Sequence, residues 1–408
     1  MSEDIPTGKV IVAAIQAAPV FLDCDATVEK ACRLIDEAAE RGARIMVFPE
    51  TFIPGYPFWP RDNSGPARAP ILKAFVRYFR NSVAIPSPQT DAMCAAAKRA
   101  NAYVVMGLSE RDSEYGGSLY NTMLFIGPDG QILGKHRKLV PTYGERCIWG
   151  MGDGSTLQVF PTEYGKLGGL VCYEHHMVLT RYALMAMGER IHAAVWPAHR
   201  YLKNIVDAAC RQYAFEGQVF VITASSYMNA GMVPDWFELK EASYWDAAGG
   251  SGIIGPLGNY LAGPTYDKEE ILVAELDFEQ IIQAKSIVDS VGHYSRWDVL
   301  SLNLNTTKYA PIHPRPASRT NGDAVAGPIG DDLSTLARLA KDEDPETREI
   351  VARLIDRIER RTRSIELRPP RSLVAVGSPE NYRPKERRPP ERSRPRAKKK
   401  TLSQGGIR

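Results

Sequence analysis

Apolar positions along the first three quarters of the chain follow two alternating periods. Residues 10–17 form an almost continuous apolar run, which is typical of a β-strand covered on both faces. The next segment has apolar residues three or four positions apart, which predicts a helix with an N-cap at Asp25 and a stop at Gly42. A second apolar run at 44–48 follows and ends just before Glu50. Strand and helix signals therefore alternate from the start of the chain.

This alternation continues to about residue 300 and includes two hairpin signals built around Pro and Gly. It predicts an α/β fold with layers of helices and sheets over about residues 8–300. The further elements predicted are strands at 103–108, 167–172, 191–196, 219–223 and 271–276, hairpins at 122–126 with 131–134 and at 251–254 with 259–262, and helices at 72–79, 177–188 and 204–216.

The composition changes after residue 300. Residues 305–330 are rich in Pro, Asn, Gly and Thr, as in a linker, and helical patterns follow at 331–341 and 345–363. The net charge of +3 combines a last segment, 367–408, of net charge +10 with a remainder of −7. Repeated Pro and Arg with few large apolar residues predict disorder in that segment.

We therefore predict three parts along the chain. Residues 1–304 form the α/β domain, 305–366 a linker with a helical extension and a possible oligomer contact, and 367–408 a basic tail. The N-terminal residues are polar, and no apolar run approaches the roughly 18–20 residues that a membrane span needs. The six cysteines lack Cys-x-x-Cys and zinc spacings, so we expect reduced thiols and a cytoplasmic enzyme.

Three reactive side chains follow predicted strands. Glu50 and Cys172 lie at strand ends, and Lys138 comes after the first hairpin. Ligands bind in α/β folds at such strand ends. A carboxylate of raised pKa can deprotonate a thiol, and an ammonium group can stabilise negative charge on the attacked substrate. Taken singly, each residue also fits a structural role: a core cysteine, a helix-capping acid and a solvated lysine.

The segments around these residues resemble the three signature blocks of the nitrilase superfamily. The blocks are Phe48-Pro49-Glu50, His136-Arg137-Lys138-Leu139 and Gly169-Leu170-Val171-Cys172-Tyr173-Glu174, in the family's order and spacing. The resemblance covers about residues 8–300. It implies a layered α-β-β-α sandwich, a catalytic Glu50, Lys138 and nucleophilic Cys172, and no cofactor.

Further segments are similar to the nitrilase branch in particular. The stretch 141–150, Pro-Thr-Tyr-Gly-Glu-Arg-Cys-Ile-Trp-Gly, resembles a nitrilase motif and implies that Glu145 is a second active-site glutamate. Gly292-His293-Tyr294-Ser295-Arg296 also resembles a nitrilase segment. Each of these residues could instead have only a structural role: Glu145 as an acid in a surface loop, and His293 as a histidine in the core or at an interface. By the resemblance, the substrate-binding residues expected are Tyr56, Tyr173, Trp196 and His293.

The sequence also departs from the nitrilase pattern. Tyr173 replaces the Trp that usually follows the nucleophile, His175 and His176 replace the common next residues, and Trp297 stands where Pro is common. These changes leave the substrate class open. Adjacent histidines are poorly placed to share one ion, so we expect no metal site.

The resemblance implies hydrolysis of a nitrile to the carboxylic acid and ammonia through a thioimidate on Cys172. An amidase or carbamoylase of the same superfamily and cyanide hydration are alternatives, whereas the membrane-bound N-acyltransferase branch does not fit. A non-enzymatic alternative is an oligomeric scaffold or a nucleic-acid binder acting through the tail, where residues 391–400 hold six Lys or Arg. Nucleic acid is the less favoured partner, because the tail has almost no aromatic residues for base stacking. Resembling enzymes form dimers that extend into spirals or filaments, so we expect a homo-oligomer.

Overall fold

The apolar run within strand β1 (Lys9–Gln16) reflects burial on both faces of the strand. Val10, Val12 and Ala14 face one hydrophobic core, while Ala13 and Ile15 face another. Successive side chains of a strand point to opposite faces, so a strand buried on both sides has no polar face. The computed structural model describes residues 5–59, 68–310 and most of 333–366. It divides the chain into two compact units, 1–311 and 312–408.

Two sheets form the middle layers of the first unit, and the strands of each are read from edge to edge. The first sheet has the order β13-β1-β2-β3-β4-β5, and the second has the order β10-β11-β9-β8-β7-β6, with β12 paired to β11. Strands β1, β2 and β3 are parallel, as are β7, β8 and β9. The bounds of the other strands are β2 Ile45–Val47, β3 Tyr103–Arg111, β4 Leu119–Ile126, β5 Ile132–Arg137, β6 Phe160–Thr162, β7 Gly165–Val171, β8 Glu189–Trp196, β9 Phe220–Ser225, β10 Tyr227–Asn229, β11 Asp246–Ile254, β12 Tyr260–Tyr266 and β13 Glu270–Asp277.

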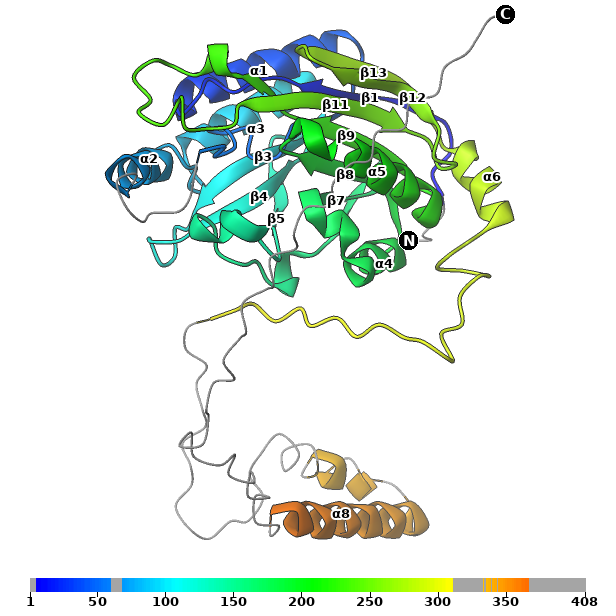
Figure 1. Ribbon diagram of the computed structural model, residues 1–408. Coiled ribbons are helices and arrows are strands. Elements are labelled where there is room, and N and C mark those ends of the chain that lie inside the picture. The colour runs from blue at the N-terminus through cyan, green and yellow to red at the C-terminus, as the bar shows by residue number, and fades with distance from the viewer. Residues whose placement is uncertain are drawn as a thin grey trace, which may run out of the picture. The chain divides into compact units, whose positions relative to one another are not determined.

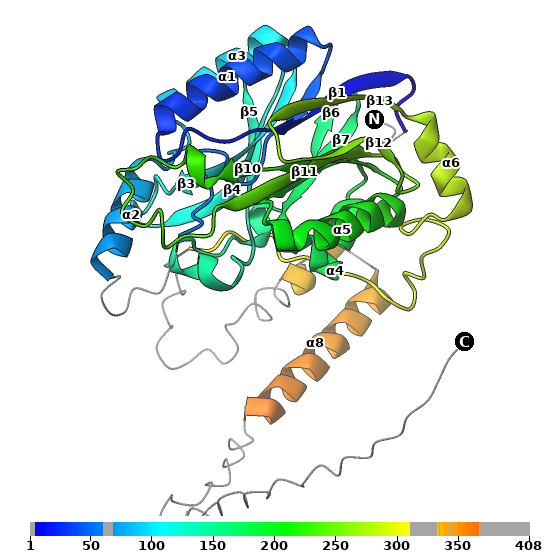
Figure 2. The same cartoon turned by 45° about the horizontal axis from the view of Figure 1, so that its top comes forward.

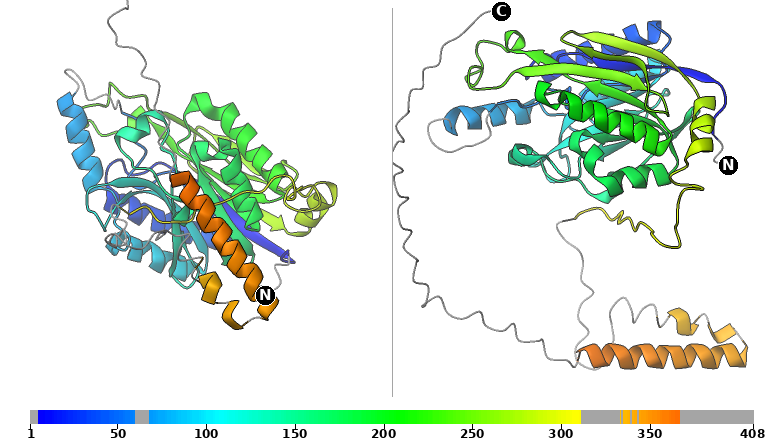
Figure 3. Two further views of the ribbon diagram at one scale, coloured as in Figure 1. Left: turned by 90° about the horizontal axis from the view of Figure 1, so that it is seen from below. Right: turned by 45° about the vertical axis from the view of Figure 1, so that its right-hand side comes forward.

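Helices cover the outer faces of both sheets. Helices α1 (Cys24–Glu40) and α3 (Pro88–Ala100) lie side by side on the first sheet, and α4 (Val178–Ala186) and α5 (Lys203–Gly217) cover the second (Figures 1 and 2). Helices α2 (Arg68–Arg80) and α6 (Glu279–Ile287) lie at opposite ends of these layers (Figure 3). The predicted α-β-β-α sandwich is therefore confirmed.

Two predictions of local structure were wrong. Helix α1 begins two residues earlier than expected, because the Asp23 side chain, and not that of Asp25, accepts the N–H of Ala26. Helix α3 was missed because its buried face consists largely of small alanines, which give a weak periodic signal. Its start is nevertheless well defined by a capping box between Ser87 and Thr90.

The second unit contributes helix α8 (Pro345–Glu366), which matches the helix predicted at 345–363. Asp344 caps its first turn through the N–H groups of Glu346 and Thr347, and Ile350 and Leu354 are exposed on its surface. The predicted basic tail at 367–408 lies outside the described residues. None of the helices that the structure describes has the length and apolar composition to cross a membrane.

Candidate active site

The ends of three strands bring four reactive side chains together. Glu50 follows β2, Lys138 follows β5 and Cys172 follows β7, while Glu145 lies in a 3₁₀ turn at Tyr143–Cys147. Lys138 Nζ lies 3.1 Å from Glu50 Oε1 and 2.8 Å from Glu145 Oε2. One ligand atom from each of Glu50, Glu145 and Cys172 lies within 4.8 Å of the other two. All four side chains are buried.

Cys172 lies on a strained turn. Its φ of 54° falls in the left-handed region, which residues other than glycine rarely adopt. The thiol is buried, and the backbone N–H of Tyr173 acts to lower its pKa. Burial raises the pKa of the Cys172 thiol well above its usual value, against the opposing effect of Lys138. The resting thiol is therefore protonated and needs a base.

The two carboxylate oxygens of Glu50 have different surroundings. Oε1 accepts from Asn121 Nδ2 at 2.6 Å and from Lys138 Nζ at 3.1 Å. Oε2 is buried and has no hydrogen-bond donor among the described residues. Burial raises the pKa of Glu50 to about 7, although Lys138 and Asn121 act to lower it. Glu50 thus offers one unoccupied basic oxygen that titrates near neutral pH.

Glu145 differs from Glu50 because both of its oxygens are occupied. Oε1 accepts from the Tyr56 hydroxyl at 2.8 Å. Oε2 accepts from Lys138 Nζ at 2.8 Å and from the Thr142 N–H at 2.8 Å. A carboxylate held by three donors is poorly placed to accept a further proton, so its geometry suits orienting Lys138.

Lys138 supplies the positive charge at the centre of the site. Burial alone would lower its pKa, but Cys172, Glu50 and Glu145 outweigh burial and raise it. The ammonium group therefore stays charged. It occupies the position between the carboxylates where a metal ion would bind, so the donor set fits a thiol hydrolase better than a metal centre.

Glu174 forms hydrogen bonds to backbone groups at the ends of both β5, which precedes Lys138, and β7, which precedes Cys172. Its carboxylate accepts from Leu139 N–H at 2.7 Å and from Val171 N–H at 2.8 Å. It also pairs with His136 Nε2 at 3.0 Å. Burial alone would raise the pKa of Glu174 and lower that of His136, but their mutual attraction outweighs burial and gives the opposite shifts. The result is a buried ion pair.

Sequence reasoning did not assign roles to Asn121 or Glu174. Asn121 is a polar residue within the mostly apolar strand β4, and Glu174 is an acid two positions after the nucleophile. Both are at most 1% exposed. A polar side chain in a segment that reads as fully buried is the signal that could have found them.

The four residues expected to bind substrate have different positions. Tyr56 is buried, and its hydroxyl donates to Glu145. Tyr173 is partly buried, and the centroid of its ring lies 6.4 Å from that of Trp196. Trp196 is fully buried and stacks on His175. His293 is exposed in the segment after α6, with its ring 6.5 Å from that of Tyr294. The structure thus joins Tyr56 to the charged groups and leaves His293 on the surface.

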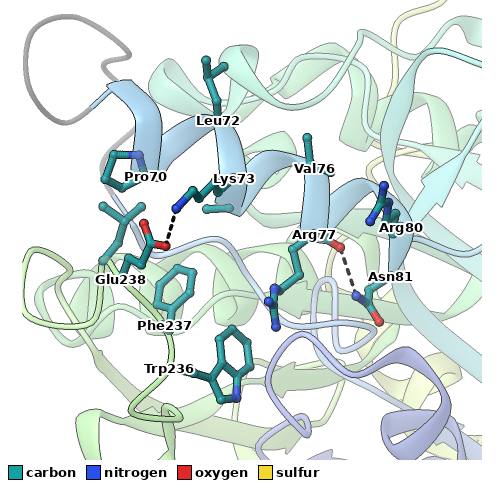
Figure 4. Close-up of a pocket in the computed structure, with 12 residues that line it drawn as sticks. Pro70, Leu72, Lys73, Val76, Arg77, Arg80, Asn81, Trp236, Phe237 and Glu238 are labelled. Carbon is teal, nitrogen blue, oxygen red and sulfur yellow. Dashed lines mark hydrogen bonds and ion pairs between the residues drawn. The ribbon is translucent and has the colours of Figure 1, made fainter.

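A groove on the surface is built from other residues. It measures about 570 Å³ and lies between α2 and the segment 236–239 (Figure 4). The Arg77 guanidinium covers the Trp236 ring at 3.9 Å, and Lys73 pairs with Glu238 at 2.8 Å. None of the candidate catalytic residues lines this groove.

Comparison with known proteins assigns the class. The carbon-nitrogen hydrolase family model matches residues 11–286. The chain is 41% identical over 316 residues to a nitrilase of Bacillus sp. (strain OxB-1), covering 74% of this chain and 90% of that one. It is 42% identical over 325 residues to a bifunctional nitrilase/nitrile hydratase NIT4A of Lupinus angustifolius, covering 76% and 90%.

A solved structure supports the same fold. The crystal structure of Saccharomyces cerevisiae Nit3, a member of branch 10 of the nitrilase superfamily, matches with a TM-score of 0.59 at 23% identity. The match covers 71% of this chain and 98% of that one. The chain belongs to the carbon-nitrogen hydrolase family.

Proposed function

We propose that Cys172, Glu50, Lys138 and Glu145 carry out the hydrolysis of a nitrile to its carboxylic acid and ammonia. The enzyme is a nitrilase, a thiol hydrolase that acts on carbon–nitrogen bonds other than peptide bonds. The assignment of roles rests on one observation: Glu50, whose carboxylate lies within 4.8 Å of the thiol, keeps an unpartnered buried oxygen, whereas both oxygens of Glu145 are occupied.

The first half of the reaction adds the thiol to the nitrile. Glu50 takes the proton of Cys172, the sulfur bonds to the nitrile carbon, and the proton passes to the nitrogen, which gives a thioimidate. Glu50 then removes a proton from a water molecule that adds to the same carbon. Lys138 stabilises the negative charge that develops in the tetrahedral intermediate, and Glu145 holds Lys138 in place.

The second half releases the products. The tetrahedral intermediate loses ammonia and leaves a thioester on Cys172. A second water molecule, again deprotonated by Glu50, hydrolyses the thioester to the acid and restores the thiol. Loss of the thiol before ammonia would give the amide instead. The balance is one nitrile and two waters to one acid and one ammonia, so no cofactor enters the reaction.

The test is product analysis on a panel of aliphatic, aryl and arylacetonitriles, cyanide and the matching amides. We expect ammonia and acid from nitriles faster than from amides, and loss of at least about 10³-fold in turnover for Cys172→Ala without loss of the fold. Cys147→Ala is the matched control, because Cys147 is exposed. Near-wild-type turnover by Cys172→Ala would overturn the assignment, and faster turnover of amides would make the enzyme an amidase.

The enzyme is also proposed to form a homo-oligomer. Exposed Leu72, Val76 and Trp236 line the groove beside α2, and Ile350 and Leu354 are exposed on α8. Apolar side chains gathered on a surface are typical of contacts between subunits. Native mass spectrometry of the full chain tests this, and a monomer at micromolar concentration would contradict it.

A further inference from the structure

A row of buried polar side chains begins at the backbone carbonyl of the nucleophile. His175 Nδ1 lies 2.7 Å from the Cys172 carbonyl oxygen, and His175 Nε2 lies 3.0 Å from His192 Nε2. His192 Nδ1 lies 2.9 Å from Glu189 Oε1, and the Tyr213 hydroxyl donates to Glu189 Oε2 at 2.6 Å. All four side chains are at most 1% exposed. The mechanism above uses none of them.

Packing holds this row in place. The His175 ring stacks on Trp196 with centroids 4.9 Å apart, and the His192 ring stacks on Tyr213 at 3.8 Å. Gly168 on β7 leaves room for the carboxylate, since a Cβ there would lie 2.1 Å from Glu189 Oε1. The positions of these side chains are therefore fixed by ring stacking and by the absence of a side chain at Gly168.

The hydrogen bonds in this row fix its proton content. A carbonyl oxygen only accepts, so the Nδ1 of His175 must carry a proton. The three links, from the Cys172 carbonyl to His175, from His175 to His192 and from His192 to Glu189, need one proton each. Two neutral imidazoles hold only two ring protons in total. A third proton must therefore reside in the row, and with it the row is electrically neutral.

The third proton lies in the link between His192 and Glu189. Burial, together with His192, lowers the pKa of His175 well below its usual value, so His175 stays neutral. The third proton is then shared by His192 and Glu189, either as a neutral pair or as an ion pair. Without that third proton, one of the three links would bring two lone pairs together, and without a polar group at position 189 His192 Nδ1 would have no partner in the row.

The peptide between Cys172 and Tyr173 connects this row to the chemistry. A peptide unit is planar, with its C=O and N–H pointing in opposite directions. The row holds the oxygen of this unit, and its N–H acts on the Cys172 sulfur, whose pKa it lowers. Fixing the oxygen therefore fixes the direction of a donor at the reaction centre, on a residue whose φ of 54° is strained.

We propose that Glu189 is a positioning residue for the nucleophile, acting through His192 and His175 on the Cys172–Tyr173 peptide. This rests on the proposed role of Cys172. A glutamine at position 189 can donate to His192 Nδ1 and accept from Tyr213, so it supplies the third proton without an ionisable group. A leucine has a similar volume and can do neither.

The test compares Glu189→Gln and Glu189→Leu in the full chain. Two properties are measured: the alkylation of Cys172 by iodoacetamide, with exposed Cys147 as internal reference, and ammonia release from benzonitrile and butyronitrile. Glu189→Gln should stay within about threefold of wild type in both. Glu189→Leu should lose about tenfold or more in Cys172 alkylation and in kcat, with KM little changed, because the nucleophile and its donor are displaced.

Ile35→Ala is the control for lost stability, since Ile35 lies on the buried face of α1 and packs in the other core. At a temperature below the unfolding temperatures of both Ile35→Ala and Glu189→Leu, the Ile35→Ala substitution should leave Cys172 alkylation and kcat unchanged. Equal effects of Glu189→Leu and Ile35→Ala, or equal effects of leucine and glutamine, would overturn the proposal. If wild type releases no ammonia from nitriles but the alkylation pattern holds, the nitrile assignment fails and the positioning role stands.

Discussion

Asn121 donates to Glu50 Oε1 at 2.6 Å and leaves the other oxygen of that carboxylate without a donor among the described residues. The amide thus fixes the side chain through Oε1 while Oε2 stays free to accept a proton. It also acts on the pKa of Glu50, because a hydrogen bond to the charged form favours that form. One contact therefore acts on both the orientation and the basicity of the proposed base, alongside burial and Lys138.

Replacing Asn121 by Leu should move the pH dependence of turnover. Glu50 has to be ionised to accept the thiol proton, so kcat/KM falls as the pH drops through its pKa of about 7. Loss of the Asn121 hydrogen bond raises that pKa and shifts the acid limb upward by up to about one pH unit. Asn101→Gly is the control, because Asn101 has a left-handed φ of 47° that glycine tolerates. An unshifted limb in Asn121→Leu would remove Asn121 from this role.

Tyr56→Phe should slow the reaction by weakening the hold on Glu145. The Tyr56 hydroxyl donates to a carboxylate that in turn holds Lys138. A hydrogen bond to a charged group contributes about 1.5 kcal/mol or more, which corresponds to about tenfold in kcat. Steady-state kinetics test this, with Tyr143→Phe as the control, because Tyr143 is 93% exposed. Equal kinetics in the two variants would exclude this role for Tyr56.

Glu174→Gln should destabilise the enzyme by about 3 kcal/mol or more, because it leaves a buried His136 without its partner charge. The effect depends on pH with a defined sign. The pKa of Glu174 is lowered from the ordinary glutamate value of about 4.5. The stability that this shift contributes is present above about pH 4.5 and is lost as the pH falls through the lowered pKa. The raised pKa of His136 gives stability that is present below about 6.5 and is lost as the pH rises through the raised value.

Chemical denaturation at a series of pH values measures this difference. The gap between wild type and Glu174→Gln should be largest between about pH 4.5 and 6.5. Glu275→Gln is the control, since the Lys9–Glu275 pair is half exposed and contributes little. A gap that does not change with pH would contradict the ion pair.

Gly168→Ala should lower both stability and kcat. The added Cβ would lie 2.1 Å from Glu189 Oε1, so the carboxylate or the strand has to move. Overpacking of this kind costs about 1–3 kcal/mol, and displacement of Glu189 disturbs the row that ends at Cys172. Thermal unfolding and kcat measure the two effects. Gly117→Ala is the control, because a Cβ at Gly117 meets nothing within 4 Å. Unchanged kcat in Gly168→Ala would separate Gly168 from the positioning of the nucleophile.

The sequence by itself determined the layers and the reactive residues. Apolar runs such as 10–17 predict doubly covered strands, because burial on both faces removes polar positions. The same local rules place Glu50 and Cys172 at strand ends. Helix α3 was missed because alanines bury little area, and the N-cap of α1 was misplaced because Asp23 and Asp25 are equally good capping residues.

The tertiary structure alone decided how those residues divide the work. Glu50 and Glu145 have chemically identical side chains. Glu50 nevertheless keeps one oxygen without a donor among the described residues, whereas Glu145 accepts from Tyr56, Thr142 and Lys138. The row from Cys172 to Glu189 likewise joins residues of separate strands and helices. Which donors reach a buried carboxylate, and how far burial shifts its pKa, depend on contacts between distant segments, and local periodicity carries no record of them.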